Sequence, residues 1–268
     1  MMKGVILAAG FGARLDPLTR DRPKPLVPLL ERPLIDYTIE AFVQCGFTEL
    51  GVILSHNGRV LQHYLGDGSR YGLAIHCLHN HLYPRGNATS ILAARDFVGQ
   101  EPFVVSMSDH LISPQILSTL LSHIHIADHS VLCVDFEAKA APLLNDATKV
   151  WLARDGYVVR IGKGLKRWHA VDVGVFLFQP RILDHIVEML HHCDGPYTIT
   201  RAVRRMIAHG DRLGTCDVSG HFWLDIDTWE DLIYARKVLR IGLSRLDLQA
   251  SELSEEGIYA NRYFGQSA

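Results

Sequence analysis

Short apolar runs alternate with amphipathic stretches through the first half of the chain. Residues 4–8 form a continuous apolar run, which is typical of a parallel strand buried on both faces. Between residues 33 and 45, apolar side chains recur at helical spacing, which predicts an amphipathic helix that opens at a proline and is closed by Gly46. The alternation of strand and helix continues through residues 50–54, 59–65, 73–78, 89–98, 103–107 and 114–125. This order predicts a mostly parallel sheet with helices on both faces and right-handed crossovers.

Beyond residue 130 the pattern changes to strands with few helices between them. Strands are predicted at residues 131–136, 148–153, 157–161, 171–178 and 213–218, and helices at 181–191, 198–209 and 229–239. We therefore predict one α/β domain over residues 1–243, a Rossmann-like mixed sheet with parallel central strands and a small antiparallel β-extension over the active site. Residues 244–268 are polar with little periodicity, which predicts a C-terminal tail or linker.

Composition excludes several classes of protein. The 268 residues carry 27 Lys and Arg against 29 Asp and Glu, whereas proteins that bind nucleic acid usually have a basic excess. No window approaches the ~20 apolar residues that cross a bilayer, and the first apolar run is too short for a signal peptide. Five scattered cysteines without a CxxC pair favour a reduced, cytoplasmic protein. No spacing among the fifteen histidines matches a metal-binding template.

The densest chemical signal is the segment LAAGFGARLDPLTRDRPKPLVP, residues 7–28. The chain turns on Gly10 and Gly12, where backbone amides can approach phosphate oxygens without a Cβ in the way. Arg14 follows, and Lys24 sits between two prolines that stiffen its loop. A triphosphate brings roughly four negative charges and a sugar phosphate about two more, so an enzyme that joins them needs amides, cations and a metal ion at close range.

Neither of two common phosphate-binding motifs describes this loop. It lacks the GxxxxGK[ST] of a Walker A motif, and Leu15 occupies the third glycine position of a Rossmann GxGxxG. Two glycines alone would favour a structural turn. The whole string, however, resembles the signature of the sugar-1-phosphate nucleotidylyltransferases, G-x-G-x-R followed by a P-K-P-L loop, and the resemblance runs to about Leu239.

The resemblance implies roles for the residues of this segment. Arg14 is expected to hold the departing β- and γ-phosphates and Lys24 the α-phosphate. The strand end and glycine loop are expected to hold the nucleotide: Leu7, Ala8, Ala9, Gly10 and Gly12. The resemblance also implies two aspartates that bind Mg²⁺, the expected cofactor.

The first of these aspartates matches Asp109, which follows the predicted strand 103–107. A carboxylate at the carboxyl end of a parallel strand faces the ligand crevice of an open α/β sheet. Ser108 stands where the family usually has glycine, which is a small departure from its pattern.

The second aspartate lies in the segment WLDIDT, residues 223–228, which matches a W-x-D-x-x-T pattern. Two carboxylates suit Mg²⁺, which prefers hard oxygen ligands. Asp225 is the main candidate and Asp227 a further one. The alternative for Asp227, or for Thr228, is to cap the helix predicted to start at Trp229.

The acceptor site is expected in the second half of the domain. The segment DGYVVRIGK resembles the family's segment ending in a lysine that grips the sugar phosphate, here Lys163, with Gly162 in place of a frequent acidic residue. Lys149, Asp172 and Gly174 fit a second contact surface. For Lys149 the alternative is an exposed strand lysine.

Four segments together resemble the inositol-1-phosphate cytidylyltransferases: residues 86–90, 147–149, 171–174 and 223–228. This resemblance implies CTP as the donor and inositol 1-phosphate as the acceptor, with Asn87 and Ser90 at the base. A carboxamide both donates and accepts hydrogen bonds, which suits the edge of a pyrimidine. The alternative for Asn87 is a turn residue after Gly86.

Members of that subfamily are often fused to a membrane CDP-alcohol phosphotransferase. Neither membrane helices nor a DG-x2-AR motif occurs here, whereas residues 256–262 resemble the start of the linker. Two alternatives follow: a split enzyme with a separate phosphotransferase as partner, or an enzyme trimmed at this linker. A homo-oligomer is a further expected assembly. The alternative functions are hexose-1-phosphate uridylyl-, thymidylyl- or guanylyl transfer, phosphocholine-type cytidylyl transfer, and a catalytically silent nucleotide-sugar binding protein. Retention of Lys24 and the aspartates argues against the silent protein.

Overall fold

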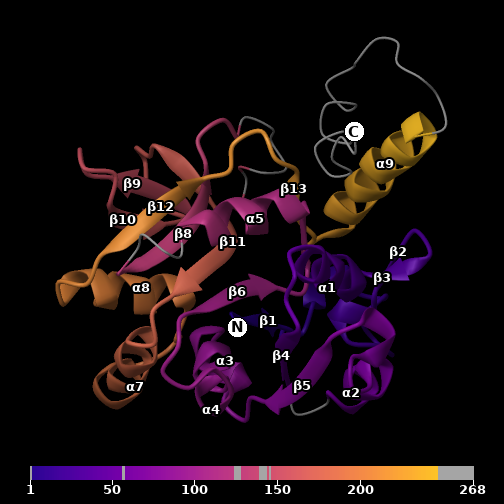
Figure 1. The fold of residues 1–268 in the computed structure, drawn as a ribbon, viewed down its shortest axis with the longest axis horizontal. Helices are drawn as coiled ribbons and strands as arrows, with labels where there is room; N and C mark the ends of the chain where they lie inside the picture. The colour runs from indigo at the N-terminus through magenta and orange to yellow at the C-terminus, as the bar shows by residue number, and fades with distance from the viewer. Residues whose placement is uncertain (1, 56–57, 124–127, 139–143, 145, 247–268) are drawn as a thin grey trace.

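A computed structural model describes residues 2–55, 58–123, 128–138, 144 and 146–246. Its main element is a mixed sheet whose strands follow the order β10-β9-β11-β6-β1-β4-β5, with β8 joined to β11 and β12 joined to β8 (Figure 1). The strands are β1 (Lys3–Leu7), β4 (Glu49–Leu54), β5 (Ala74–His79), β6 (Phe103–Met107), β8 (Ser130–Asp135), β9 (Lys149–Leu152), β10 (Val158–Gly162), β11 (Ala170–Phe178) and β12 (Leu213–Asp217). This architecture confirms the predicted α/β class.

The centre of the sheet is parallel, as the alternating pattern predicts. β1 pairs in parallel with β4 on one side and with β6 on the other, and β4 pairs in parallel with β5. Val5 and Ile6 of β1 are fully buried on opposite faces, which explains why this strand is apolar throughout.

Helices pack on both faces of the sheet, so the apolar residues form two cores. One core includes side chains from α1 (Leu34–Gln44), α2 (Arg59–Leu65), α5 (Pro114–Ser122) and α9 (Trp229–Leu246). The other includes side chains from α3 (Ala88–Leu92), α4 (Arg95–Val98), α7 (Ile182–His192) and α8 (Ile199–Ala208). Single 3₁₀ turns lie at Ala13–Leu15, Lys24–Leu26, Ser69–Tyr71 and Tyr83–Arg85.

The predicted antiparallel extension is continuous with the main sheet. β11 runs antiparallel to β6, β8 and β9, and β10 runs antiparallel to β9. β12 differs, because it pairs in parallel with β8. The pairing of β11 with β8 is irregular between Asp172 and Phe176, and this irregularity lies beside the candidate site.

Two pairs of very short strands were not predicted. β7 (His110–Ile112) pairs antiparallel with β13 (Trp223–Asp225), and β2 (Pro28–Leu29) pairs with β3 (Arg32–Pro33). Segments of two or three residues are too short to show a period, so only tertiary pairing reveals them. The β7–β13 ladder places Asp225 opposite His110 and so joins two distant acidic segments.

Three helix boundaries differ from the prediction. The helix expected at residues 89–98 is split into α3 and α4, the helix expected at 114–125 ends as α5 at Ser122, and α9 continues seven residues past Leu239. None of the described helices combines the length and apolarity that a membrane span requires. The predicted tail lies outside the described residues from 247 onward.

The first turn of α8 allows a test of this architecture. The Thr198 hydroxyl accepts a hydrogen bond from the backbone N–H of Arg201 at 3.2 Å. Thr198→Ala should lower the free energy of unfolding by about 1 kcal/mol, because it removes the N-cap acceptor. Urea denaturation measures this change, and Thr198→Ser should restore most of the loss. A wild-type midpoint and slope in the alanine variant would contradict the cap.

Candidate functional site

The glycine loop and Asp109 meet at one edge of the sheet because β1 and β6 are parallel neighbours. Leu7, the last residue of β1, lies opposite Met107, the last residue of β6, and the Ser108 N–H donates to the Leu7 carbonyl at 3.1 Å. A cavity of about 700 Å³ opens at this edge. Its charged lining comes from both halves of the domain: Arg14, Asp109, Asp146, Lys163, Asp172, Asp225, Asp227, Glu230 and Asp231.

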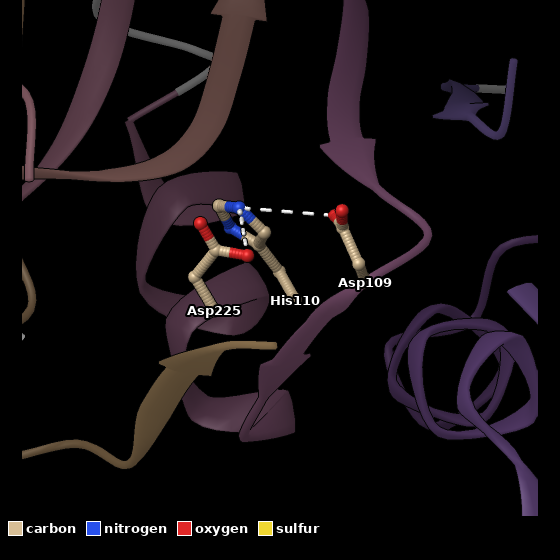
Figure 2. Close-up of side chains that lie close together, drawn as sticks. All are labelled: Asp109, His110 and Asp225. Atoms are coloured by element: carbon tan, nitrogen blue, oxygen red, sulfur yellow. Dashed lines mark ion pairs between the residues drawn. The ribbon is translucent and has the colours of Figure 1, made fainter. Parts of the chain in front are cut away.

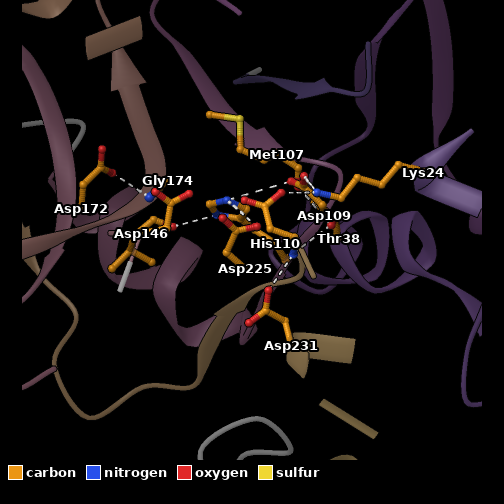
Figure 3. Close-up of polar contacts among 12 residues, drawn as sticks. Lys24, Thr38, Met107, Asp109, His110, Asp146, Asp172, Gly174, Asp225 and Asp231 are labelled. Carbon is orange, nitrogen blue, oxygen red and sulfur yellow. Dashed lines mark hydrogen bonds and ion pairs between the residues drawn. The ribbon is translucent and has the colours of Figure 1, made fainter. Parts of the chain in front are cut away.

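Lys24 is the buried cation of the site. Its side chain is only 6% exposed, and Nζ lies 2.5 Å from Oδ2 of Asp109 (Figure 3). Nζ also lies 2.6 Å from Oδ1 of Asp227. Burial alone would lower the pKa of Lys24, but the two carboxylates outweigh burial and raise it. Lys24 therefore stays protonated at neutral pH.

Gly12 allows Lys24 to reach this position. Its φ is +66°, in the left-handed region, and a Cβ on Gly12 would come within 2.6 Å of Cβ of Lys24. The glycine is thus required by the protein's own packing. Gly10 differs, since it is exposed and a Cβ there would meet no protein atom within 4 Å.

Arg14 and Lys163 both line the cavity and share Asp146. An Arg14 guanidinium nitrogen lies 3.1 Å from Oδ2 of Asp146, and Nζ of Lys163 lies 2.7 Å from the same oxygen. Arg14 also contacts Oδ2 of Asp227 at 2.5 Å. These cations are more than half exposed, so anionic ligands can compete with Asp146 for them at little cost in stability.

His110 and Asp225 lie side by side because of the β7–β13 ladder (Figure 2). Nε2 of His110 is 3.6 Å from Oδ1 of Asp225 and 4.0 Å from Oδ1 of Asp109. Oδ1 of Asp225 is buried and has no hydrogen-bond partner among the described residues. Burial raises the pKa of Asp225 to about 7, with His110 opposing the shift and Asp109 adding to it.

These contacts divide the three aspartates into two groups. Both oxygens of Asp227 are engaged by cations, one by Lys24 and the other by Arg14. Asp109 contacts Lys24 through Oδ2, and its Oδ1 accepts no hydrogen bond from the described residues; Oδ1 of Asp225 is buried and likewise has no partner among them. The open oxygens and Nε2 of His110 lie within 4.8 Å of one another, so these residues fit a divalent ion. Asp227 is the least suited of the predicted metal ligands.

Thr228 caps α9, which is the capping role that the sequence left open for Asp227 or Thr228. Oδ2 of Asp231 accepts from the Thr228 N–H at 2.7 Å, and the Asp231 N–H donates to the Thr228 hydroxyl at 3.2 Å. Such a reciprocal pair is a capping box. Asp231 also accepts from the Asp227 N–H at 3.0 Å, which fixes the backbone that carries Asp227.

The predicted base-binding residues have structural contacts of their own. Oδ1 of Asn87 accepts from the Ile199 N–H at 2.9 Å, at the start of α8, although Asn87 also lines the cavity. Ser90 is buried, and its hydroxyl accepts from Nδ2 of Asn80 at 3.0 Å. Leu7, Ala8 and Ala9 are buried at the strand end. Among the described residues that line the cavity, neither Ser90 nor any of Leu7, Ala8 and Ala9 is found.

The predicted acceptor residues separate into two groups. Lys163, Asp172 and Gly174 line the cavity, whereas Lys149 is not among its lining residues. Asp172 accepts from the Gly174 N–H at 2.7 Å, and burial raises the pKa of Asp172 to about 6. Lys149 is half-buried at the start of β9, so its proposed contact with the acceptor stays a prediction.

Sequence reasoning missed three residues of the site: Asp146, His110 and Asp231. Asp146 lies next to the segment 147–149 but carries no local pattern that marks it as a bridge between two cations. His110 directly follows Asp109, which was the available signal. Asp231 stands three residues after Thr228, and a Thr-x-x-Asp spacing before a helix is a capping signature.

Comparisons with known proteins identify the family of the chain. The family described as "Nucleotidyl transferase" matches residues 3–142 and 163–240. The chain is 30% identical to the low-salt glycan biosynthesis nucleotidyltransferase Agl11 of Haloferax volcanii, over 89% of this chain and 66% of that protein. It is 35% identical to the bifunctional IPC transferase and DIPP synthase of Rubrobacter xylanophilus, over 85% of this chain and 49% of that protein.

The chain thus spans about half to two thirds of the length of these relatives. Among solved structures, the inositol-1-phosphate CTP transferase from T. maritima aligns with a TM-score of 0.75 and 24% identity, covering 88% of this chain and 96% of that one. Because the two sequences are only 24% identical, this similarity shows a shared fold alone.

The two loop glycines allow a paired test of the site. Gly12→Ala should lower the free energy of unfolding by at least about 1 kcal/mol, because it combines a left-handed backbone with a clash against Lys24. Gly10→Ala should leave unfolding unchanged to within about 0.5 kcal/mol and should instead raise KM for the nucleotide. Thermal unfolding and steady-state kinetics of both variants check this. A wild-type KM in Gly10→Ala would show that no ligand approaches that amide.

Proposed function

The chain belongs to the nucleotidyl transferase family, and from this premise we propose that it transfers CMP from CTP to inositol 1-phosphate and releases pyrophosphate. The observation that carries the proposal is the arrangement around Lys24. A buried ammonium is held by Asp109 and Asp227 beside the glycine loop. Additional cations, Arg14 and Lys163, lie where the cavity opens.

The proposed reaction is an in-line displacement at the α-phosphorus. An oxygen of the acceptor phosphate forms the new P–O bond, and the bond between the α-phosphorus and the bridging oxygen breaks, with the electron pair leaving on pyrophosphate. No general base is required, because a phosphate dianion is already a nucleophile at neutral pH. Catalysis then rests on positioning and charge neutralisation.

The resting contacts suggest how each cation would act. Lys24 is fixed at the edge of the sheet and would contact the α-phosphate, where negative charge rearranges in the transition state. Arg14 is held by carboxylates in an exposed position and would move onto the β- and γ-phosphates. Lys163 reaches the cavity from beyond β10 and would hold the acceptor phosphate.

Asp109 and Asp225 would hold Mg²⁺ through their open oxygens. When bound, Mg²⁺ supplies positive charge to the phosphate oxygens of the donor. Asp227 would instead keep Lys24 and Arg14 in place, since both of its oxygens contact them.

The choice of CTP and inositol 1-phosphate is supported by the resemblance of four segments to inositol-1-phosphate cytidylyltransferases and by the IPC transferase among the relatives. Asn87 lines the cavity, and its Oδ1 accepts a hydrogen bond from the backbone at the start of α8. This contact orients the whole carboxamide. A fixed carboxamide suits the edge of a pyrimidine.

A pyrophosphate-release screen tests the substrate assignment. Purified protein is assayed with ATP, CTP, GTP and UTP against inositol 1-phosphate, glucose 1-phosphate, mannose 1-phosphate and phosphocholine. CTP with inositol 1-phosphate should give the highest kcat/KM, because a site fitted to the cytosine edge leaves a buried polar group unpaired with UTP. A preference for GTP or ATP would overturn the cytidylyl assignment, and release with no pair would overturn the transferase proposal.

The division of the aspartates is tested with two isosteric variants. Asp225→Asn should lower kcat on the order of a hundredfold and raise the Mg²⁺ concentration for half-maximal activity, because it removes a metal ligand. Asp227→Asn should lower activity with little change in that concentration, because it loosens Lys24 and Arg14. Metal titrations of activity distinguish the two, and circular dichroism checks the fold. Equal shifts in metal dependence would show that both carboxylates bind the ion.

A further inference from the structure

His110 takes no part in the reaction proposed above, although its ring lies at the centre of the site. The ring is held from two directions. Nδ1 lies 3.1 Å from the carbonyl oxygen of Val173. Gly174, with φ at +78°, passes so close that a Cβ there would lie 2.2 Å from Cε1 of His110.

The contact with Val173 assigns the tautomer of the imidazole. A carbonyl oxygen can only accept a hydrogen bond, so Nδ1 carries the proton and Nε2 of the neutral ring presents its lone pair. That lone pair faces Oδ1 of Asp225 at 3.6 Å and Oδ1 of Asp109 at 4.0 Å. Both separations exceed hydrogen-bond range, so a proton on Nε2 would not link the ring to either carboxylate.

When His110 is neutral, three electron-pair donors face one another without a hydrogen bond, an arrangement that a divalent cation between them satisfies. An ion about 2.1 Å from each ligand places neighbouring ligand atoms ~3 Å apart and opposite ones ~4.2 Å apart. The observed separations of 3.6 and 4.0 Å are both shorter than the ~4.2 Å that a single ion can span, so one ion can reach His110 and each carboxylate after small side-chain rotations. Asp225 contributes an oxygen that is buried and has no partner in the described part of the chain, and Asp109 turns its second oxygen to Lys24.

We propose that His110 is the third protein ligand of the divalent ion, together with Asp109 and Asp225. The inference rests on the metal site of the proposed function and extends it from two carboxylates to two carboxylates and one imidazole. Imidazole is a borderline ligand that suits Mn²⁺ and Co²⁺ better than Mg²⁺, which prefers oxygen. The site should therefore bind Mn²⁺ more tightly than Mg²⁺, and Gly174 keeps the ring in the position that binding requires.

The test is spectroscopic and uses the intact protein loaded with Mn²⁺ alone. Electron spin-echo envelope modulation should show coupling of the Mn²⁺ spin to one ¹⁴N nucleus. Protein labelled with ¹⁵N-histidine should lose the ¹⁴N modulation and gain the ¹⁵N pattern. Absence of nitrogen coupling in the wild-type protein overturns the proposal without any variant, so the result does not depend on how a substitution folds.

Two variants identify the histidine. His110→Asn should abolish the nitrogen coupling and raise the Kd for Mn²⁺ about tenfold or more, measured by calorimetry. His123→Asn is the matched control. Nδ1 of His123 also contacts a backbone carbonyl, that of Thr119 at 2.9 Å, and His123 follows the end of α5 and does not line the cavity. It should leave coupling and affinity unchanged. Persistent coupling in folded His110→Asn would assign the nitrogen elsewhere.

Failure of this inference and failure of the proposed function give different results. Pyrophosphate release from CTP with Mg²⁺ but no nitrogen coupling with Mn²⁺ would remove His110 from the ligand set and leave the transferase standing. Nitrogen coupling that depends on His110, without turnover of any nucleotide, would support the ligand and overturn the reaction.

Discussion

The site is organised by the buried ion pairs of Lys24. An ammonium with a 6% exposed side chain is costly unless carboxylates compensate for its lost hydration, and here Asp109 and Asp227 do so from two different segments. Removing either carboxylate would leave an undercompensated buried charge. This requirement ties the loop after β1 to the loop after β6 and to the segment before α9, which are far apart in sequence.

Secondary structure then separates the roles of Asp225 and Asp227. The two residues flank Ile226, which is fully buried, so the chain alternates between the core and the cavity at this point. β13 holds Asp225 opposite His110 by its pairing with β7, while the capping box of Thr228 and Asp231 fixes Asp227 at the start of α9. Two aspartates that look equivalent in the sequence thus face different partners.

The sequence predicted what depends on local pattern. The parallel strands and the meeting of the glycine turn with Asp109 were predictable because strand order places their chain segments at one edge of a parallel sheet. Lys24 was instead singled out by the resemblance of its segment to a family signature. The β7–β13 ladder was not predictable, because three-residue strands have no readable period, and with it the contact of His110 with Asp225 was missed. Asp146 was missed for a related reason, since a bridge between Arg14 and Lys163 is defined only by tertiary structure.

The charges of the site also constrain the order of binding. Asp109, Asp146, Asp225 and Asp227 face three cations, and Asp231 adds a further carboxylate to the cavity lining. Without a divalent ion the cavity therefore carries excess negative charge, which would repel a triphosphate at short range. The pKa of Asp225 is raised to about 7 mainly by burial, and the adjacent carboxylate of Asp109 adds to the shift. A divalent ion reverses the balance and favours the ionised form of Asp225. Nucleotide binding should therefore require the ion to arrive first or together with the nucleotide, and the cations now held by Asp146 and Asp227 would then be free to move onto the phosphates.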